Sequence, residues 1–137
     1  MYTKTPFLET RDLIVVPGML AGPRGQTTLR LAVDTAATST LITPEVADRV
    51  GYGARHGGRL MAVSSPLGRE HGFRLRVRQL TVLGFAFRNA SIGVFDLTDH
   101  DDIDGLLGLN LLEFLDYEVQ SSRRCILAQP TAIISQG

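Results

Sequence analysis

The chain carries the stretch Leu31-Ala-Val-Asp34-Thr-Ala-Ala-Thr38, in which an apolar run ends at an aspartate and continues into small and hydroxyl-bearing side chains. Aspartate is depleted in strands, so a carboxylate at the end of a buried strand needs hydrogen-bond partners or has a chemical role. The simplest structural role is a turn cap, in which the Asp34 carboxylate accepts hydrogen bonds from backbone N–H groups. The stretch alone leaves both roles open.

The residues around this stretch predict short strands joined by turns. Alternation from Thr27 to Val33 predicts a strand, and the turn Gly22-Pro-Arg-Gly25 separates it from the apolar run that begins at Leu13. We therefore expect a hairpin near the start of the chain. Further strands are expected over residues 73–77, 87–95 and 125–128, with a turn at Leu83-Gly84.

One short helix is predicted over residues 43–51. Thr43 can cap its N-terminus, Pro44 suits the first helical position, and Gly51 ends it. A second apolar stretch, from Leu106 to Phe114, also follows a helical period. Together these patterns indicate an all-β fold with one or two short helices.

The stretch Ile103-Asp-Gly105-Leu-Leu-Gly108-Leu-Asn110 is the second unusual feature. Two glycines three residues apart are costly in a helix, so we expect a close backbone approach that requires them. The preceding residues form an acidic cluster without the glycine spacing of a calcium loop. We interpret this cluster as a solvated loop with helix-capping carboxylates; its members are Asp96, Asp99, His100, Asp101, Asp102 and Asp104.

Composition excludes several classes of protein. The 137 residues suit one domain, and 14 basic against 14 acidic side chains leave no net field toward nucleic acid or an anionic membrane. No apolar run approaches the roughly 18–20 residues that span a bilayer. The single cysteine, Cys125, excludes an intrachain disulfide, and we expect it to be a small core residue. No pattern predicts a metal site.

Taken together, the strand ending at Asp34-Thr35-Ala36-Ala37 and the downstream Leu106-Leu107-Gly108 resemble the retropepsin-like aspartic proteases. The resemblance implies a closed all-β barrel with a flap hairpin and one or two short helices, forming a single domain over residues 1–137. Residues 60–69, with Pro66-Leu67-Gly68 at the tip, fit the flap.

The resemblance also implies the site. Asp34 would supply one catalytic carboxylate, Thr35 would bond across a two-fold axis, and Ala36 and Ala37 would support the loop. In the flap, the substrate-binding residues would be Val63, Ser64 and Ser65.

The function implied is that of an aspartic endopeptidase. Hydrolysis by carboxylates needs one group to activate water and one to protonate the carbonyl oxygen. One Asp34 per chain is half of such a pair, so we expect a homodimer acting on polypeptide, with no metal or organic cofactor. We expect a cytoplasmic location, because the N-terminus lacks the apolar core of a signal peptide.

Two alternatives follow from the residues. The third motif position is usually glycine in this family, and Ala36 adds a methyl group that is strained where φ is positive. The chain could therefore be a catalytically impaired dimer that binds peptides. It could also be a monomeric β-barrel binding domain in which Asp34 only caps a turn.

Overall fold

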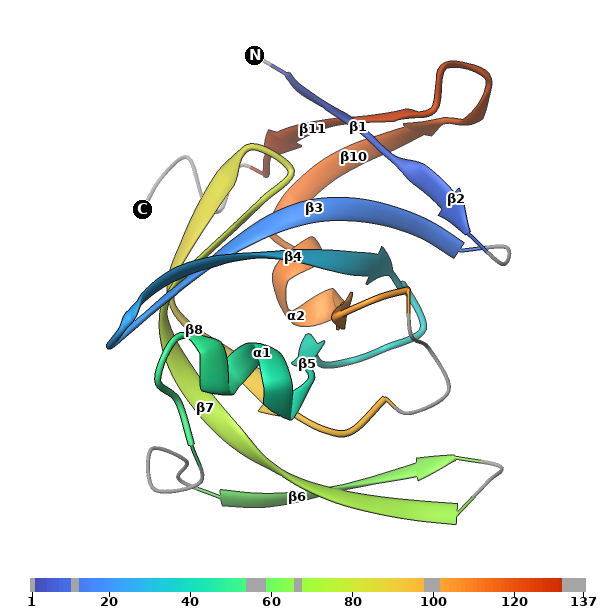
Figure 1. The fold of residues 1–137 in the computed structure, drawn as a ribbon. Helices are drawn as coiled ribbons and strands as arrows, with labels where there is room; N and C mark the ends of the chain where they lie inside the picture. Colours follow the sequence, from blue (N-terminus) through green and yellow to red (C-terminus); the bar gives the residue numbers. More distant parts are fainter. Residues whose placement is uncertain (1, 11–12, 54–58, 66–67, 98–101, 132–137) are drawn as a thin grey trace.

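The computed structural model describes residues 2–10, 13–53, 59–65, 68–97 and 102–131. The chain folds into strands with short helices between them (Figure 1). The strands are β1 (Thr3–Pro6), β2 (Leu8–Thr10), β3 (Leu13–Gly22), β4 (Gly25–Val33), β5 (Leu41–Ile42), β6 (Arg59–Ser65), β7 (Gly68–Val82), β8 (Phe85–Val94), β9 (Gly105–Leu107), β10 (Leu115–Gln120) and β11 (Cys125–Pro130). The helices are α1 (Pro44–Arg49), α2 (Leu109–Leu112) and a 3₁₀ turn over Ser121–Arg123.

The larger sheet closes into a barrel. Its eight strands follow the order β2-β3-β4-β9-β5-β8-β7-β6, and β3 also pairs with β7. Strand β7 is 15 residues long; it pairs with β8 from Phe73 to Val82, and its last four residues, 79–82, also pair with β3. The β3–β7 pairing joins the two sides of the sheet, which confirms the closed all-β barrel expected from the sequence.

Strand β9 runs through the middle of this sheet. It pairs in parallel with β4, with Leu31 opposite Gly105 and Val33 opposite Leu107. On its other side it pairs antiparallel with β5, with Leu41 opposite Leu106. A strand of three residues therefore joins β4 to β5.

A smaller sheet has the order β1-β11-β10 and lies at one end of the molecule, whereas the β6–β7 hairpin lies at the opposite end (Figure 1). Thr3 in β1 connects this sheet to the barrel, because its hydroxyl donates a 2.6 Å hydrogen bond to the Leu83 carbonyl. Cys125 at the start of β11 is buried, as expected.

The core fills the barrel with aliphatic side chains. Leu29 and Leu31 of β4 are buried, and Val33 is partly buried against the same cluster, which confirms the face predicted from the alternation. The largest fully buried side chains are Leu20, Leu31, Ile42, Leu75, Leu80, Leu83, Ile92, Leu107, Leu112, Ile126, Val16 and Val46.

The predicted short helix forms with the predicted cap. The Val46 N–H group donates to the Thr43 hydroxyl at 3.4 Å, Pro44 occupies the first helical turn, and Gly51 follows with φ of 90°. The turn at Leu83-Gly84 is also present, with φ of 55° and 84°.

The helical interpretation of residues 106–114 is wrong in its first part. Leu106 and Leu107 belong to strand β9, and helix α2 covers only Leu109–Leu112. Backbone pairing with β4 and β5 on both sides overrides the helical spacing of the leucines. The strands β1, β2, β5 and β10 were not predicted. The first three are too short to show a period, whereas β10 alternates apolar and polar side chains from Leu115 to Gln120, a signal that was missed.

Among the described residues, every helix is too short or too polar to span a membrane.

The two glycines of the second motif pack against neighbouring backbone, as expected. A Cβ atom at Gly105 would collide with the Leu41 carbonyl oxygen, and one at Gly108 would collide with the Ser39 carbonyl group. Any side chain at these positions would push β9 away from the segment that follows the Asp34 loop.

We predict that Gly105→Ala lowers the free energy of unfolding by about 1–3 kcal/mol, because the added methyl group overpacks against backbone that cannot move aside. Urea denaturation of the purified protein measures this. Gly53→Ala is the matched control, since a Cβ atom there meets no atom of the described residues. Equal stability of the two variants would contradict the close packing at β9.

Candidate active site

Asp34 lies directly after β4 and is held by β9. Its N–H group donates a 3.0 Å hydrogen bond to the Leu107 carbonyl, which continues the β4–β9 pairing by one step. Side chains alternate along a strand, so Asp34 projects to the same side as Ala32, away from the core face of Leu31 and Val33. The backbone therefore directs the carboxylate away from the barrel interior.

The loop after Asp34 folds back onto its carboxylate. Oδ1 of Asp34 accepts a 3.0 Å hydrogen bond from the Ala36 N–H group, and the Asp34 carbonyl accepts one of 3.2 Å from Ala37 N–H. This is the turn cap that the residues alone allow. Oδ2 accepts no hydrogen bond from any residue in the described ranges, and the Asp34 side chain is only partly buried. One oxygen is thus fixed and the other is available.

Ala36 occupies its position without backbone strain. The positive-φ residues other than glycine in the described part of the chain are Leu83, Asn89 and Arg124, so Ala36 lies outside the left-handed region. Ala36 is also exposed. The methyl group that replaces the family's usual hydrogen atom is therefore compatible with this loop and faces outward beside the carboxylate.

Helix α2 packs directly under the Asp34 loop. The Ala37 carbonyl accepts a 2.8 Å hydrogen bond from Leu109 N–H, and the Thr38 carbonyl accepts one of 3.2 Å from Asn110 N–H. Ala37 is partly buried, whereas Thr35 at the loop apex is exposed. The first turn of α2 therefore supports the loop through backbone contacts.

Thr40 and Asn110 were not identified from the sequence, yet they lock the end of this loop. Oδ1 of Asn110 accepts hydrogen bonds from both Thr40 N–H and the Thr40 hydroxyl, each 2.8 Å long. Thr40 is fully buried, and its Oγ1 accepts a 3.0 Å bond from Gly108 N–H. Nδ2 of Asn110 donates a 2.9 Å hydrogen bond to the Ser91 carbonyl in β8. The signal that could have revealed this contact is Asn110, a polar residue between Leu109 and Leu111.

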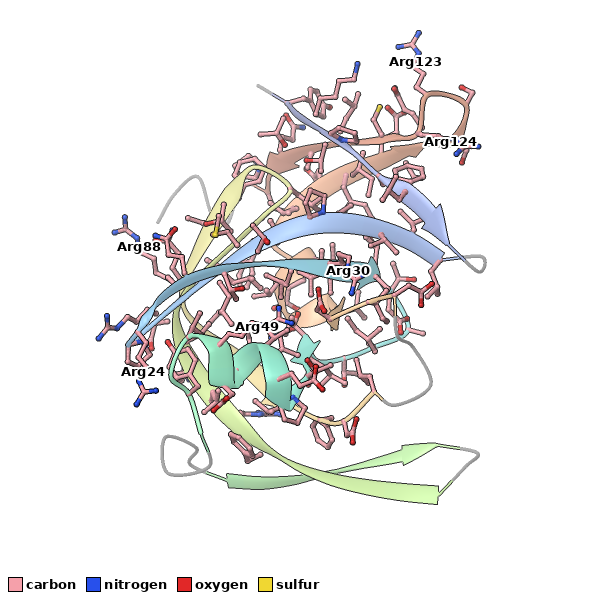
Figure 2. All side chains as sticks on the ribbon, viewed as in Figure 1. Arg24, Arg30, Arg49, Arg88, Arg123 and Arg124 are labelled. Atoms are coloured by element: carbon pink, nitrogen blue, oxygen red, sulfur yellow. The ribbon has the colours of Figure 1, made fainter. Side chains whose placement is uncertain are left out.

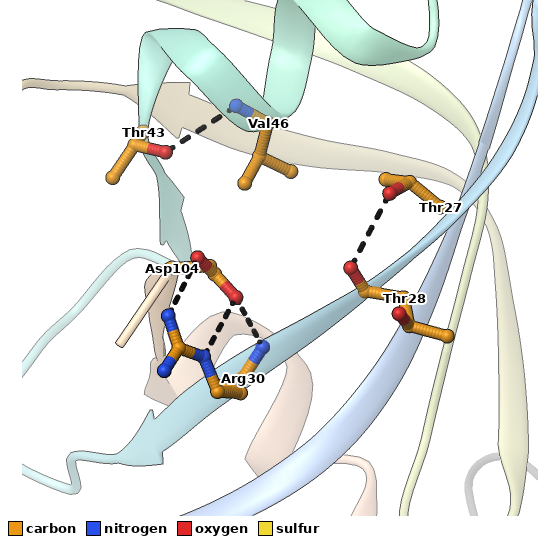
Figure 3. Close-up of polar contacts among 6 residues, drawn as sticks. All are labelled: Thr27, Thr28, Arg30, Thr43, Val46 and Asp104. Carbon is orange, nitrogen blue, oxygen red and sulfur yellow. Dashed lines mark hydrogen bonds and ion pairs between the residues drawn. The ribbon is translucent and has the colours of Figure 1, made fainter. Parts of the chain in front are cut away.

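Asp104 does not cap a helix, contrary to the interpretation of the acidic cluster. Helix α2 has Gly108 as its N-cap residue and no side-chain cap, and the Asp104 carboxylate binds Arg30 of β4 instead (Figure 3). The hydrogen bond from Arg30 to Asp104 raises the pKa of the guanidinium above its ordinary value. Asp99, His100 and Asp101 lie outside the described residues.

The flap expected from the sequence corresponds to the β6–β7 hairpin. Strands β6 and β7 pair antiparallel, with Ser65 opposite Gly68 and Val63 opposite Glu70. The ends of β6 and β4 lie on the same side of the molecule (Figure 1). Pro66, Leu67 and the side chains of Val63, Ser64 and Ser65 lie outside the described part, so no contact is assigned to them.

Within the described ranges, no group of three or more histidine, cysteine, aspartate or glutamate side chains comes together in a way that could hold a metal ion. The polar groups described around the Asp34 loop are carboxylate, hydroxyl, carboxamide and backbone groups.

Solved structures share this fold. A retropepsin-like aspartic protease from Rickettsia conorii is similar with a TM-score of 0.66 and 18% identity, covering 90% of this chain and 97% of that one. The retroviral protease-like domain of Ddi1 from Leishmania major gives 0.57 and 19%, covering 83% and 86%. EIAV protease, solved in complex with the inhibitor HBY-793, gives 0.56 and 17%, covering 77% and 90%. The barrel is therefore retropepsin-like.

Among curated proteins, none matches this chain significantly. A family model described as aspartyl protease matches residues 16–111. That range runs from β3 through the Asp34 loop and the flap hairpin to β9 and α2, and it includes both motifs singled out in the sequence. The chain belongs to the aspartyl protease family.

Proposed function

We propose that this protein is an aspartic endopeptidase whose active site is a pair of Asp34 carboxylates, one from each of two copies of the chain. The observation that supports this most strongly is the state of the Asp34 side chain. Oδ1 is held by Ala36 N–H, Oδ2 has no partner among the described residues, and the side chain is only partly buried. Such a carboxylate has a fixed orientation and keeps one oxygen available for chemistry.

The reaction needs two carboxyl groups in different protonation states. Two carboxyls in hydrogen-bond contact cannot both be ionised, so the pair shares one proton. The ionised Asp34 takes a proton from water as the water oxygen bonds to the peptide carbonyl carbon. The protonated Asp34 donates its proton to the carbonyl oxygen. Collapse of the tetrahedral intermediate then breaks the C–N bond, and the nitrogen leaves after accepting a proton from the pair.

The dimer supplies the second carboxylate. The chain has one Asp-Thr-Ala-Ala loop, so a two-fold axis through the exposed apex of that loop is the arrangement that yields a pair. In this arrangement Thr35 bonds across the axis, and Ala36 and Ala37 keep the loop closed behind the carboxylates. Residues 1–137 act as a single domain that is half of the enzyme.

The substrate is an extended polypeptide held beneath two flaps, one from each copy. The β6–β7 hairpin offers backbone groups for strand-like pairing with a peptide. Val63, Ser64 and Ser65, beside the tip, are the proposed contacts. One Asp34 of the pair must carry a proton, because that proton is the one donated to the carbonyl oxygen of the substrate.

The Asp34→Asn variant tests the catalytic role. We predict that it folds normally, because asparagine keeps an oxygen that accepts the Ala36 N–H bond, and that kcat for an unfolded protein substrate at mildly acid pH falls by at least about 10³-fold. The exposed Asp48→Asn substitution in α1 is the matched control and keeps full activity. Equal cleavage by wild type and Asp34→Asn would rule out the proposed chemistry and favour a peptide-binding module.

The Ala36→Gly variant tests the methyl group beside the Asp34 carboxylate. We predict that kcat/KM rises by up to about tenfold for substrates with bulky side chains near the scissile bond, because removing the methyl lets the backbone approach more closely. Parallel assays with substrates carrying alanine at the same position provide the control and change less. An unchanged or lower kcat/KM for both substrates would show that Ala36 does not restrict the cleft.

A further inference from the structure

Arg30 and Asp104 make an unusually complete ion pair (Figure 3). Oδ2 of Asp104 accepts hydrogen bonds from the Arg30 backbone N–H at 2.8 Å and from Nε at 3.3 Å. Oδ1 accepts a third from Nη2 at 3.4 Å. The carboxylate thus binds the guanidinium with both oxygens and also fixes the backbone of β4.

The Asp104 backbone makes two further hydrogen bonds, one to Arg30 and one to Thr43. Its N–H group donates a 2.7 Å hydrogen bond to the Arg30 carbonyl, and its carbonyl accepts a 3.0 Å bond from Thr43 N–H. Thr43 follows β5 and caps α1. Asp104 therefore connects β4 with the junction between β5 and α1 through both its side chain and its main chain.

The carboxylate is the more buried partner of the pair. The Asp104 side chain is 15% exposed and that of Arg30 is 51% exposed. Arg30 lies against the body of the barrel, whereas Arg24, Arg88, Arg123 and Arg124 extend outward (Figure 2). Asp102 adds a weaker attraction for the same guanidinium. Partial burial of the carboxylate reduces solvent screening and strengthens the pairing.

The position of the pair relative to Asp34 gives it a role. Asp104 immediately precedes β9, and Arg30 precedes Asp34 by four residues in β4, so the pair and Asp34 stand at opposite ends of one short ladder. That ladder has only three paired positions. A slip of one residue would carry the Leu107 carbonyl away from Asp34 N–H. A clamp at the other end prevents such a slip.

We propose that Asp104, acting with Arg30, is a positioning residue for Asp34: it fixes the register of β9 against β4 and thereby the carbonyl that orients the catalytic carboxylate. The proposal rests on the catalytic role of Asp34 given above and deepens it. Neither residue takes part in bond making or breaking.

Kinetics of two substitutions test the proposal. Asp104→Asn keeps the shape of the side chain but removes its negative charge. Arg30→Lys keeps the positive charge but removes the planar guanidinium that binds both carboxylate oxygens. We predict that each lowers kcat by about tenfold or more, because small displacements of a catalytic group are costly, while KM changes by less than about twofold. Asp48→Asn again serves as the matched control. The double variant Asp104→Asn with Arg30→Gln should be no slower than Asp104→Asn, because the two residues act as one unit.

Amide hydrogen exchange gives a readout that needs no activity. The Asp34 amide is protected by its bond to Leu107, so we predict that its exchange speeds up by about tenfold or more in Asp104→Asn. Amides in the β10–β11 pairing should keep wild-type rates, which separates a local loss of register from general destabilisation.

The outcomes separate the two claims. If wild type cleaves and Asp34→Asn does not, but Asp104→Asn and Arg30→Lys keep wild-type kcat and wild-type exchange at Asp34, the positioning role is overturned and the proposed function stands. A rise in KM at constant kcat also overturns it, since the pair would then serve substrate binding. If wild type does not cleave at all, the proposed function fails, whereas faster exchange at Asp34 in Asp104→Asn still supports the clamp.

Discussion

A single backbone hydrogen bond, from Asp34 N–H to the Leu107 carbonyl, joins the two motifs on which this molecule is built. It exists because β9 passes between β4 and β5 and meets both through their backbones. Gly105 and Gly108 make this approach possible, since a side chain at either would strike neighbouring backbone. Closure of the barrel, the path of the loop and the direction of the carboxylate all depend on that crossing.

Around this crossing, polar groups fix the geometry of the Asp34 loop, and apolar groups stabilise the fold. Leucine, isoleucine and valine fill the barrel, while Thr40 and Asn110 hold the loop end from within. Asp104 and Arg30 hold the other end of the short ladder. Polar bonds made inside the protein, such as those of Thr40 and Asn110, fix one geometry, because each broken bond leaves a costly unpaired group. A reactive carboxylate needs that single geometry more than it needs additional stability.

The sequence predicted the parts of this arrangement that depend on local chemistry. The strand into Asp34, the capped helix after Thr43 and the close approach at the two glycines follow from alternation, capping and steric rules, and all are present. The split of residues 106–114 into a strand and a helix could not be predicted, because the strand owes its existence to two partners distant in the chain.

The supporting residues of the site were missed for the same reason. Thr40 meets Asn110 across 70 positions of sequence, and Arg30 meets Asp104 across 74. Contacts between residues so far apart in the sequence leave no periodic pattern. Each residue taken alone has an ordinary interpretation as a loop or surface side chain. Only the topology of β9 brings these partners together on either side of Asp34.

The central claim, that two Asp34 carboxylates from two chains form one active site, is tested most directly by mixing. Wild-type chain is refolded together with increasing amounts of Asp34→Asn chain, and the cleavage rate per wild-type chain is measured. Shared sites predict that this rate falls toward zero as the variant comes into excess, since most wild-type chains are then paired with an inactive partner. A rate per wild-type chain that does not change at any ratio would contradict the account.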